Sequence, residues 1–388
     1  MNVEVKLCEI ADVTKLAGFE FTKYISYEET GEIIALRALN LRNGVLDLTD
    51  VKRINRTVSD MLPRSKLFQN DILLTYTGNG YGDCSIIMEN DKYHLAPNIC
   101  KITPKTEKVI PYYLYSCIRS ASFYKQMTNH MVGSSQPTIP MKILRELKIP
   151  LPSISIQRKI AAILSALDEK IAINRAINDN LEQQAMALYA EMFLNSSNND
   201  VTSGTLSDIA VITMGQSPSG SSYNEDGVGE VFYQGRAEFG FRFPKRRLFT
   251  TEPKRMAETG DVLLSVRAPV GDLNEAYERC CIGRGLGAIH SKTGHSSFVL
   301  YTMFALRSQL DVFNGEGTVF GSINRDALNA IPIDIPPVTE IDQFEAVAHP
   351  MDELIRANYE ENCRIEAIRD SLLPKLMSGE IDVSAVQL

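Results

Sequence analysis

Two segments of the 388-residue sequence combine basic side chains with aromatic and amide side chains. Positions 233–255 hold seven Lys or Arg against two acidic residues, and positions 37–66 hold seven against three. Arg can bind guanine O6 and N7 through two hydrogen bonds, and Asn or Gln can bind adenine in the same way. Side chains of these types could therefore recognise base edges and phosphates of a nucleic acid. A charged run is more commonly a solvated surface, and that alternative stays open for each segment alone.

Within the second segment, Phe239, Phe241 and Phe243 alternate with other residues. Alternate side chains of a strand point to opposite faces of its sheet. The spacing therefore predicts a strand that presents Arg242 on the face opposite the three rings.

No motif in the chain predicts catalysis. The sequence contains no Asx-Pro-Pro-aromatic motif, P-loop, nucleophile elbow, or acidic cluster followed by Lys. The glycine runs at 78–82 and 283–287 lack GxGxxG spacing, and we interpret them as turns rather than nucleotide loops. The five His show no zinc-ligand spacing, so no metal site is expected.

The composition is that of a globular protein with two or three domains. No apolar stretch is long enough for a membrane helix, and the seven Cys lack a CxxC pair, which favours a soluble protein of the reducing cytoplasm. The net charge of −8 argues at first against a nucleic-acid partner. Residues 339–388 carry a net charge of −7, so most of the excess negative charge lies in this one region, which favours a protein partner there. The overall negative charge therefore does not exclude DNA binding by the two basic segments.

The chain is a tandem duplication, which predicts two similar halves of mixed α+β structure. Apolar strand-like runs bounded by turn residues recur in the second half in the same order. Three pairs match: LCEIA at 7–11 with LSDIA at 206–210, NDILL at 70–74 with GDVLL at 260–264, and LKIPLP at 147–152 with IDIPPV at 333–338.

Each half is followed by a long segment with a heptad repeat, and the second seam repeats the first at an offset of 184, including two Asn. Two such helices can pair as an intramolecular antiparallel coiled coil, in which buried Asn sets the register. The alternative is that each helix packs on its own domain, and Pro350 predicts a kink or a restart in the second helix. The seam residues are Leu164, Leu167, Ile171, Asn174, Asn178 and Leu181 in the first helix and Met351, Ile355, Asn358, Asn362, Ile365 and Leu372 in the second.

Composition and periodicity predict four consecutive parts. The polar cluster around 195–204 marks the boundary between the two halves. The parts are a first domain at 1–153, a long helix at 154–194, a second domain at 195–338, and a distal long helix with the C-terminal tail at 339–388.

Three stretches carry a resemblance to a known family: IPLP at 149–152 leading into QRKI at 157–160, GSSQPTI at 133–139, and SLLPKLMSGEI at 371–381. With the duplication, they make the chain similar to the specificity subunit of type I restriction–modification systems over nearly its whole length. The counterpart of the second stretch, at 317–323, lacks the Gln.

The resemblance implies two target-recognition domains held apart by an antiparallel helical pair with pseudo-twofold symmetry. It implies a non-catalytic subunit that binds double-stranded DNA, with two modification (methyltransferase) subunits and with restriction/translocase subunits as partners. S-adenosylmethionine, ATP and Mg²⁺ would bind in those partners and not in this chain. Because the halves differ in sequence and a rigid helical pair fixes their separation, the DNA target is expected to be bipartite and asymmetric.

The candidate DNA contacts are chosen for their hydrogen-bonding chemistry. Two other classes of function stay open: a duplicated adaptor that only recruits proteins, and a self-contained methyltransferase or nuclease with a cryptic site. The candidates are Arg37, Asn40, Arg42, Thr77, Asn79, Tyr81, Ser134, Ser135 and Gln136 in the first half and Gln234, Arg236, Arg242, Lys245, Arg246, Arg247 and Arg267 in the second.

Overall fold

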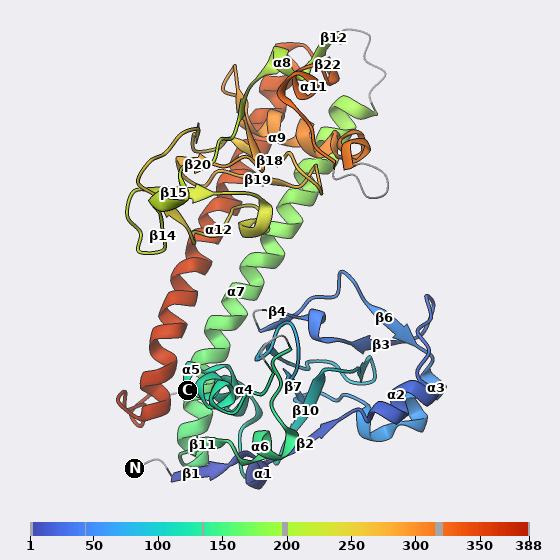
Figure 1. Ribbon diagram of the computed structural model, residues 1–388, viewed down its shortest axis with the longest axis vertical. Helices are drawn as coiled ribbons and strands as arrows, with labels where there is room; N and C mark the ends of the chain where they lie inside the picture. Colours follow the sequence, from blue (N-terminus) through green and yellow to red (C-terminus); the bar gives the residue numbers. More distant parts are fainter. Residues whose placement is uncertain (1–2, 43, 134–135, 196–200, 315–320, 387–388) are drawn as a thin grey trace. The chain divides into compact units, whose positions relative to one another are not determined.

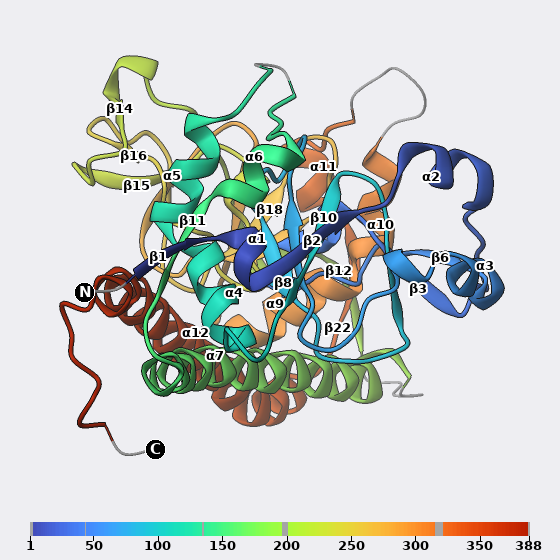
Figure 2. The same cartoon turned by 90° about the horizontal axis from the view of Figure 1, so that it is seen from below.

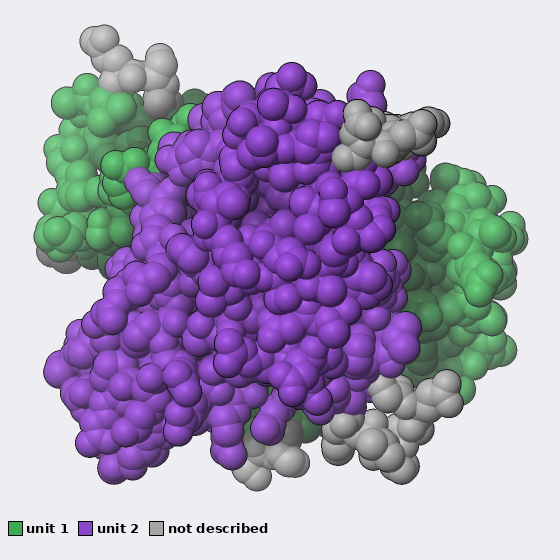
Figure 3. Space-filling model, turned by 90° about the horizontal axis from the view of Figure 1, so that it is seen from above, with its two compact units in different colours: residues 1–173, 361–388 green, residues 174–360 purple. Residues whose placement is uncertain are grey.

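The computed structural model describes residues 3–42, 44–133, 136–195, 201–314 and 321–386. Its contacts divide into two compact units, coloured separately in Figure 3: unit 1 is Met1–Ile173 with Glu361–Leu388, and unit 2 is Asn174–Glu360. Each unit holds strands, short helices and a part of both long helices, α7 and α12 (Figure 1). Within the described residues, no helix is long and apolar enough to cross a bilayer.

Unit 1 is built around a four-stranded antiparallel sheet. Along the central strand β7, Ile72 and Leu74 face one apolar cluster while Leu73 faces a second, so that both sides of the strand are buried. This explains why the run is continuously apolar rather than alternating. The strands lie in the order β2 (Ala11–Lys15), β10 (Ile99–Pro104), β7 (Ile72–Thr75) and β8 (Cys84–Ile86).

The first apolar cluster of unit 1 lies between this sheet and the helices that follow it in the sequence. The second apolar cluster lies between the same sheet and a smaller sheet. Buried Tyr113 and Leu114 of α4 belong to the first cluster. The helices are α4 (Pro111–Arg119), α5 (Ala121–Asn129) and α6 (Met141–Glu146). The smaller sheet has the order β6 (Lys52–Ile54), β3 (Ile33–Leu36) and β9 (Tyr93–Leu95), with β3 parallel to β9.

Short elements complete unit 1. A two-stranded sheet closes the unit by joining the start of the chain to the segment before α7. These elements are β1 (Val3–Lys6) paired with β11 (Lys148–Leu151), the hairpin β4 (Leu41–Arg42) with β5 (Val45–Leu46), and the helices α1 (Leu7–Ile10), α2 (Gly18–Tyr24) and α3 (Arg56–Met61).

Unit 2 repeats this arrangement. Its main sheet has the same antiparallel order, with Val262 and Leu264 facing one cluster and Leu263 the other. The strands are β13 (Ala210–Met214), β21 (Leu286–Ser291), β18 (Val262–Ser265) and β19 (Leu273–Glu275), and β12 (Thr202–Thr205) pairs with β22 (Pro332–Ile335) as β1 does with β11. The helices α8 (Leu206–Ile209), α9 (Ser296–Ala305), α10 (Arg307–Leu310) and α11 (Arg325–Asn329) complete the unit with the long helices.

The second sheet of unit 2 is larger than its counterpart but keeps one parallel pair, β15 with β20. Its order is β14 (Tyr223–Asn224), β16 (Phe249–Thr250), β15 (Glu230–Tyr233), β20 (Cys280–Ile282) and β17 (Met256–Ala257). Both Cys280 and Cys281 are buried there, and all seven cysteines of the chain are free thiols.

The repeated NDILL and GDVLL segments form the same turn in both units. Asn70 and Gly260 both have positive φ, 74° and 85°, which these residue types tolerate best. The following carboxylate accepts a hydrogen bond from the backbone N–H three residues earlier, at 2.8 Å for both Asp71 and Asp261. The duplicated motif therefore specifies a turn that starts the central strand.

In unit 1, the first part of α7 (Ile154–Tyr189) and the last part of α12 (Val338–Ser378) pack antiparallel. Leu164 and Leu376 share one buried cluster, and Lys170 Nζ lies 3.0 Å from Glu361 Oε2. Figure 1 and Figure 2 show the two helices side by side within the unit.

In unit 2, the remaining parts of the same helices meet through polar and aromatic contacts. Asn358 Nδ2 donates to Asn178 Oδ1 at 2.8 Å, and Asn178 Nδ2 donates to the Ile355 carbonyl at 3.3 Å. Tyr189 packs on Phe344 with ring centroids 5.6 Å apart. All twelve predicted seam residues are buried or half-buried.

The helix boundaries differ from the predicted ones in two places. The first α-helix ends at Tyr189, and a π-helical turn occupies Ala190–Leu194. The second helix does not restart at Pro350, because α12 runs continuously from Val338 to Ser378.

Candidate nucleic-acid interface

In unit 1, several loops meet where the strands of both sheets end. The Tyr76 N–H donates to the Asn98 carbonyl at 3.2 Å, and the Ile139 N–H donates to the Tyr76 carbonyl at 3.0 Å. The Gly78 N–H donates to the Pro137 carbonyl at 2.8 Å. We call this set of loops, residues 15–17, 37–38, 76–79, 96–98 and 136–139, the first loop edge.

Unit 2 builds the same structure with other side chains. The Val266 N–H donates to the Gly285 carbonyl at 3.0 Å, and the Ile323 N–H donates to the Val266 carbonyl at 3.1 Å. The Ala268 N–H donates to the Gly321 carbonyl at 3.0 Å, as Gly78 does to Pro137. Residues 214–217, 234–236, 266–272, 283–285 and 321–323 form this second loop edge.

Glycine is required in the second loop edge because backbones approach one another closely. A Cβ on Gly215 would lie 2.1 Å from the Gly283 carbonyl oxygen, and a Cβ on Gly285 would lie 2.8 Å from the Gln234 carbonyl oxygen. The glycine run at 283–287 therefore joins loops to one another, as its interpretation as a turn implies, and it places Arg284 at the surface.

Three of the first-half candidates lie on or beside the β4–β5 hairpin. Asn40 is fully buried, and its Nδ2 donates to the Asp47 and Asp50 carbonyls at 2.8 and 2.9 Å. Its prediction as a base contact is wrong, because the amide already holds the hairpin. Arg37 is half-buried beside Asp50, at 3.0 Å, and Arg42 is exposed.

The remaining described candidates of unit 1 gather near residues 76–82. The Thr77 and Thr138 hydroxyls are 2.5 Å apart, and exposed Asn79 and Gln136 lie in the two adjoining loops. Tyr81 is half-buried and donates from its hydroxyl to the Met127 carbonyl at 3.0 Å. Ser134 and Ser135 lie outside the residues that the structure describes.

In unit 2, Gln234, Arg236 and Arg267 all lie in the second loop edge and are exposed. Arg236 pairs with Asp272, which also lies 3.4 Å from Arg307 Nη2. Within the described part of the chain, no carboxylate lies within ion-pairing distance of the Arg267 guanidinium. This edge therefore presents donors that suit base edges and phosphates.

Arg242 is not on a strand and is not exposed, so both expectations for it are wrong. Only 3% of the residue is accessible, and its Nη2 donates to Asp352 Oδ1 at 2.9 Å and to the Tyr301 hydroxyl at 3.0 Å. The reason is the carboxylate on α12, which draws the guanidinium inward and away from any DNA. The alternation of phenylalanines contained no information about this distant partner.

The neighbouring basic candidates are exposed but lie outside the second loop edge. Arg246 pairs with Glu278, and Arg247 pairs with Glu238 and Glu225. Lys245 is exposed on the same segment. The acidic partners reduce the net charge that this segment offers to phosphate.

Sequence reasoning missed Lys15 and Arg284, which lie exposed in the first and second loop edges. Lys15 is the last residue of β2, and Arg284 lies in the loop between β20 and β21. A comparison of strand ends between the two halves could have found them.

It also missed a repeated aspartate on the long helices, Asp168 and Asp352, which are separated by the seam offset of 184. Asp168 accepts from the Tyr112 hydroxyl at 2.5 Å and from Arg119 Nη1 at 2.7 Å, within unit 1. Burial raises the pKa of Asp168, but Arg119, the Tyr112 hydrogen bond and Arg369 together hold it below its usual value. In each unit, the carboxylate ties a tyrosine and an arginine to a long helix.

Glu275 is a half-buried acid near Arg242 whose pKa is strongly shifted. Burial raises its pKa to about 7, against the lowering effect of Arg242, whose Nη1 lies 4.0 Å from Glu275 Oε2. Asp352 holds the same guanidinium more closely and adds to the rise. No group of three or more His, Cys, Asp or Glu in the described residues is arranged to hold a metal.

Comparison with known proteins identifies the family. Residues 2–183 and 198–367 match the type I restriction modification DNA specificity domain. A Methanocaldococcus jannaschii protein named as a type I restriction enzyme MjaX specificity subunit is 29% identical over 400 residues, which cover 97% of this chain and 93% of that protein. The type I restriction enzyme MjaVIII specificity subunit of the same organism is 25% identical over 356 residues, which cover 81% and 80%.

A crystal structure of the type I restriction–modification S subunit from M. genitalium has a TM-score of 0.57 at 16% identity, over 96% of this chain and 95% of that one. At this identity, the likeness shows the fold alone.

The two matched domains confirm the predicted duplication and the mixed α and β structure of each half. They also confirm recognition of DNA sequence without catalysis as the function, and they give the adaptor alternative no support. The chain therefore belongs to the family of type I restriction–modification DNA specificity subunits.

Proposed function

We propose that each unit reads one half of a bipartite, asymmetric DNA target through its loop edge. The observation that carries this proposal is that the two edges share their backbone hydrogen bonds and differ in their side chains. Exposed Lys15, Asn79 and Gln136 occupy the first edge, whereas Gln234, Arg267 and Arg284 occupy the second. Different donors and acceptors in the same frame select different bases.

The long helices would set the distance between the two half-sites. In this proposal, α7 and α12 pair as an antiparallel coiled coil with pseudo-twofold symmetry, and the seam Asn residues fix its register. The hydrogen bond between Asn178 and Asn358 supports that pairing within unit 2. A fixed register requires a spacer of fixed length between the half-sites.

Catalysis would belong to partner subunits. Two modification subunits would carry S-adenosylmethionine, and restriction subunits would use ATP and Mg²⁺, while this chain supplies the target. The concentration of negative charge in residues 339–388 favours protein rather than DNA as the contact of that region.

The test is a genome-wide map of methylated adenines in cells that carry the modification partner with or without this chain. We expect methylation only with the chain, at a motif of two different short sequences and a spacer of one length. A single uninterrupted motif, a symmetric motif or a spacer of variable length would contradict the proposal. A control strain that carries the chain without its partner should show no methylation.

A further inference from the structure

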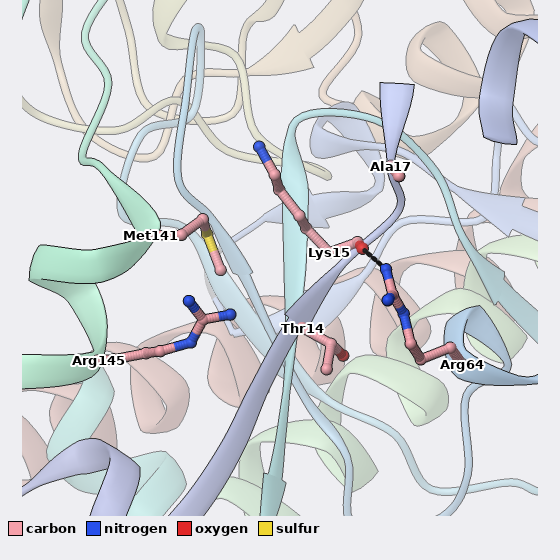
Figure 4. Close-up of a pocket in the computed structure, with 6 residues that line it drawn as sticks. All are labelled: Thr14, Lys15, Ala17, Arg64, Met141 and Arg145. Atoms are coloured by element: carbon pink, nitrogen blue, oxygen red, sulfur yellow. Dashed lines mark hydrogen bonds between the residues drawn. The ribbon is translucent and has the colours of Figure 1, made fainter. Parts of the chain in front are cut away.

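A pocket with three cationic residues in its lining borders the first loop edge in unit 1, at the end of β2 (Figure 4). Its cationic side chains come from three elements: β2, the 3₁₀ turn Pro63–Ser65 and α6. These elements are distant in sequence, so that the gathering of charge is a product of the fold. The lining residues are Thr14, Lys15, Ala17, Arg64, Met141 and Arg145.

Two of the cations are oriented by backbone carbonyls. Arg145 donates to the Val13 carbonyl from Nη2 at 2.7 Å and from Nε at 3.2 Å. Arg64 Nη2 lies 3.5 Å from the Lys15 carbonyl oxygen. A guanidinium that is already oriented loses less side-chain entropy when it binds an anion.

The pocket is poorly neutralised. Glu20 lies 3.9 Å from Arg64. For Lys15 and Arg145, the described residues provide no carboxylate within 4 Å, and the Lys15 ammonium lies over the Tyr76 ring at 5.3 Å from its centroid. The three cations of the pocket lining therefore have one nearby carboxylate among them, that of Glu20 beside Arg64.

The pocket is continuous with the loops proposed to read bases. Tyr76, under the Lys15 ammonium, is hydrogen-bonded to Ile139, which precedes Met141 by two residues. A duplex lying along the first loop edge would bring its backbone past this pocket. Hydrogen bonds to phosphates position a protein on the duplex, whereas contacts to base edges specify the sequence.

Unit 2 lacks a cation at two of the three matching places, whereas Lys254 stands where unit 1 has Arg64 at the offset between NDILL and GDVLL. The strand β13 ends in Met214 where β2 ends in Lys15, and α11 has Asn329 where α6 has Arg145. The full set of three cations is thus a feature of unit 1, and its function belongs to the first half-site.

We infer that this pocket binds a phosphodiester group of the DNA backbone and sets the position of unit 1 on its half-site. Lys15 and Arg64 donate to the phosphate oxygens, and Arg145 donates through the part of its guanidinium not engaged with Val13. The inference rests on the proposed reading of DNA by this unit. The phosphate contact would contribute to the affinity for DNA and to the position of unit 1 along the duplex, but not to the choice of bases.

The test measures the dissociation constant of the complex formed by the chain and its modification partner, as a function of salt. Two short duplexes are compared, one with the mapped target and one with its shuffled sequence. We expect Lys15→Gln and Arg64→Gln each to weaken binding to both duplexes by the same factor. Each should reduce the slope of log affinity against log salt by up to about 1.

The matched control is Lys6→Gln, which removes one charge from an exposed residue of β1 outside the pocket lining and should change neither quantity. Unchanged slopes in both pocket variants would overturn the inference, as would a loss confined to the target duplex. In those cases, discrimination between the two duplexes by the unmodified complex would still support the proposed function. Equal affinity of the unmodified complex for both duplexes would overturn the proposed function instead.

Discussion

Inside unit 2, the Arg242 guanidinium donates to the Asp352 carboxylate at 2.9 Å, and the two side chains are only 2% and 10% exposed. Removing one member of a buried pair leaves the other charge without compensation, which costs about 3–5 kcal/mol. We therefore expect Arg242→Ala to lower the free energy of unfolding by that amount, as measured by urea denaturation. Lys245→Ala, an exposed change on the same segment, should alter stability by less than about 0.5 kcal/mol.

A stable Arg242→Ala protein with weakened DNA binding would contradict this assignment. The double variant Arg242→Met with Asp352→Leu should recover much of the loss, because neither charge is then left buried.

Glu275 makes the stability of unit 2 depend on pH. Burial raises its pKa from 4.5 to about 7, so the folded state binds the proton more tightly than the unfolded state. The resulting stabilisation is complete below pH 4.5 and is lost as the pH rises through about 7. We expect Glu275→Gln to be more stable than the unmodified chain at pH 8, by a few kcal/mol at most, with the difference shrinking toward pH 5.

Urea denaturation of both proteins at several pH values measures this difference. A constant difference across that range would show that Glu275 titrates normally.

At the residue scale, local sequence predicted structure correctly where a side chain bonds within its own turn. The positive-φ residue and the following aspartate at 70–71 and 260–261 form the same turn in both units. It failed for Asn40 and Arg242, whose partners lie 10 and 110 residues away. Exposure depends on such distant partners, and no local pattern reports them.

At the scale of elements, the buried Asn pair is the most informative feature of the long helices. Asn358 donates to Asn178 at 2.8 Å, and both residues are less than 10% exposed. A single Asn178→Leu change leaves the Asn358 amide without this partner, which costs about 1–3 kcal/mol. The double change to Leu should be at least as stable as the unmodified chain, as measured by thermal or urea unfolding, because apolar pairs suit a helical seam.

Two equal and additive losses in the single variants, with no recovery in the double variant, would show that the amides do not interact. Met186→Leu, at an exposed site on α7, is the matched control and should leave stability almost unchanged.

Periodicity predicted the long helices and their seam because heptad spacing is a strong and repeated signal. It did not predict the continuity of α12 through Pro350, where the packing of Phe344, Ala348 and Ile355 outweighs the local effect of proline. The strand predicted around Arg242 does not form, because the pattern that suggested it was short, unlike the long heptad repeat. Its signal was three alternating phenylalanines over five positions, and the buried ion pair of Arg242 with Asp352 outweighed it.

At the scale of the whole molecule, the duplication was visible in the sequence, and the two matched specificity domains agree with it. The frame of each loop edge follows from repeated apolar strands and turns. The side chains that the edges present do not follow from the repeat, because this is where the two halves differ. Arg284 and Lys15 became candidates only when the strand ends were placed.

The central claim is that each unit reads its own half of the target, and a methylated-adenine map of cells with variant chains tests it most directly. For the double variant Arg267→Ala with Arg284→Ala, we predict altered base preference in one half of the motif, with the other half and the spacer unchanged. Gln136→Ala should alter only the opposite half. If either variant changes both halves equally, the assignment of one unit to one half-site is wrong.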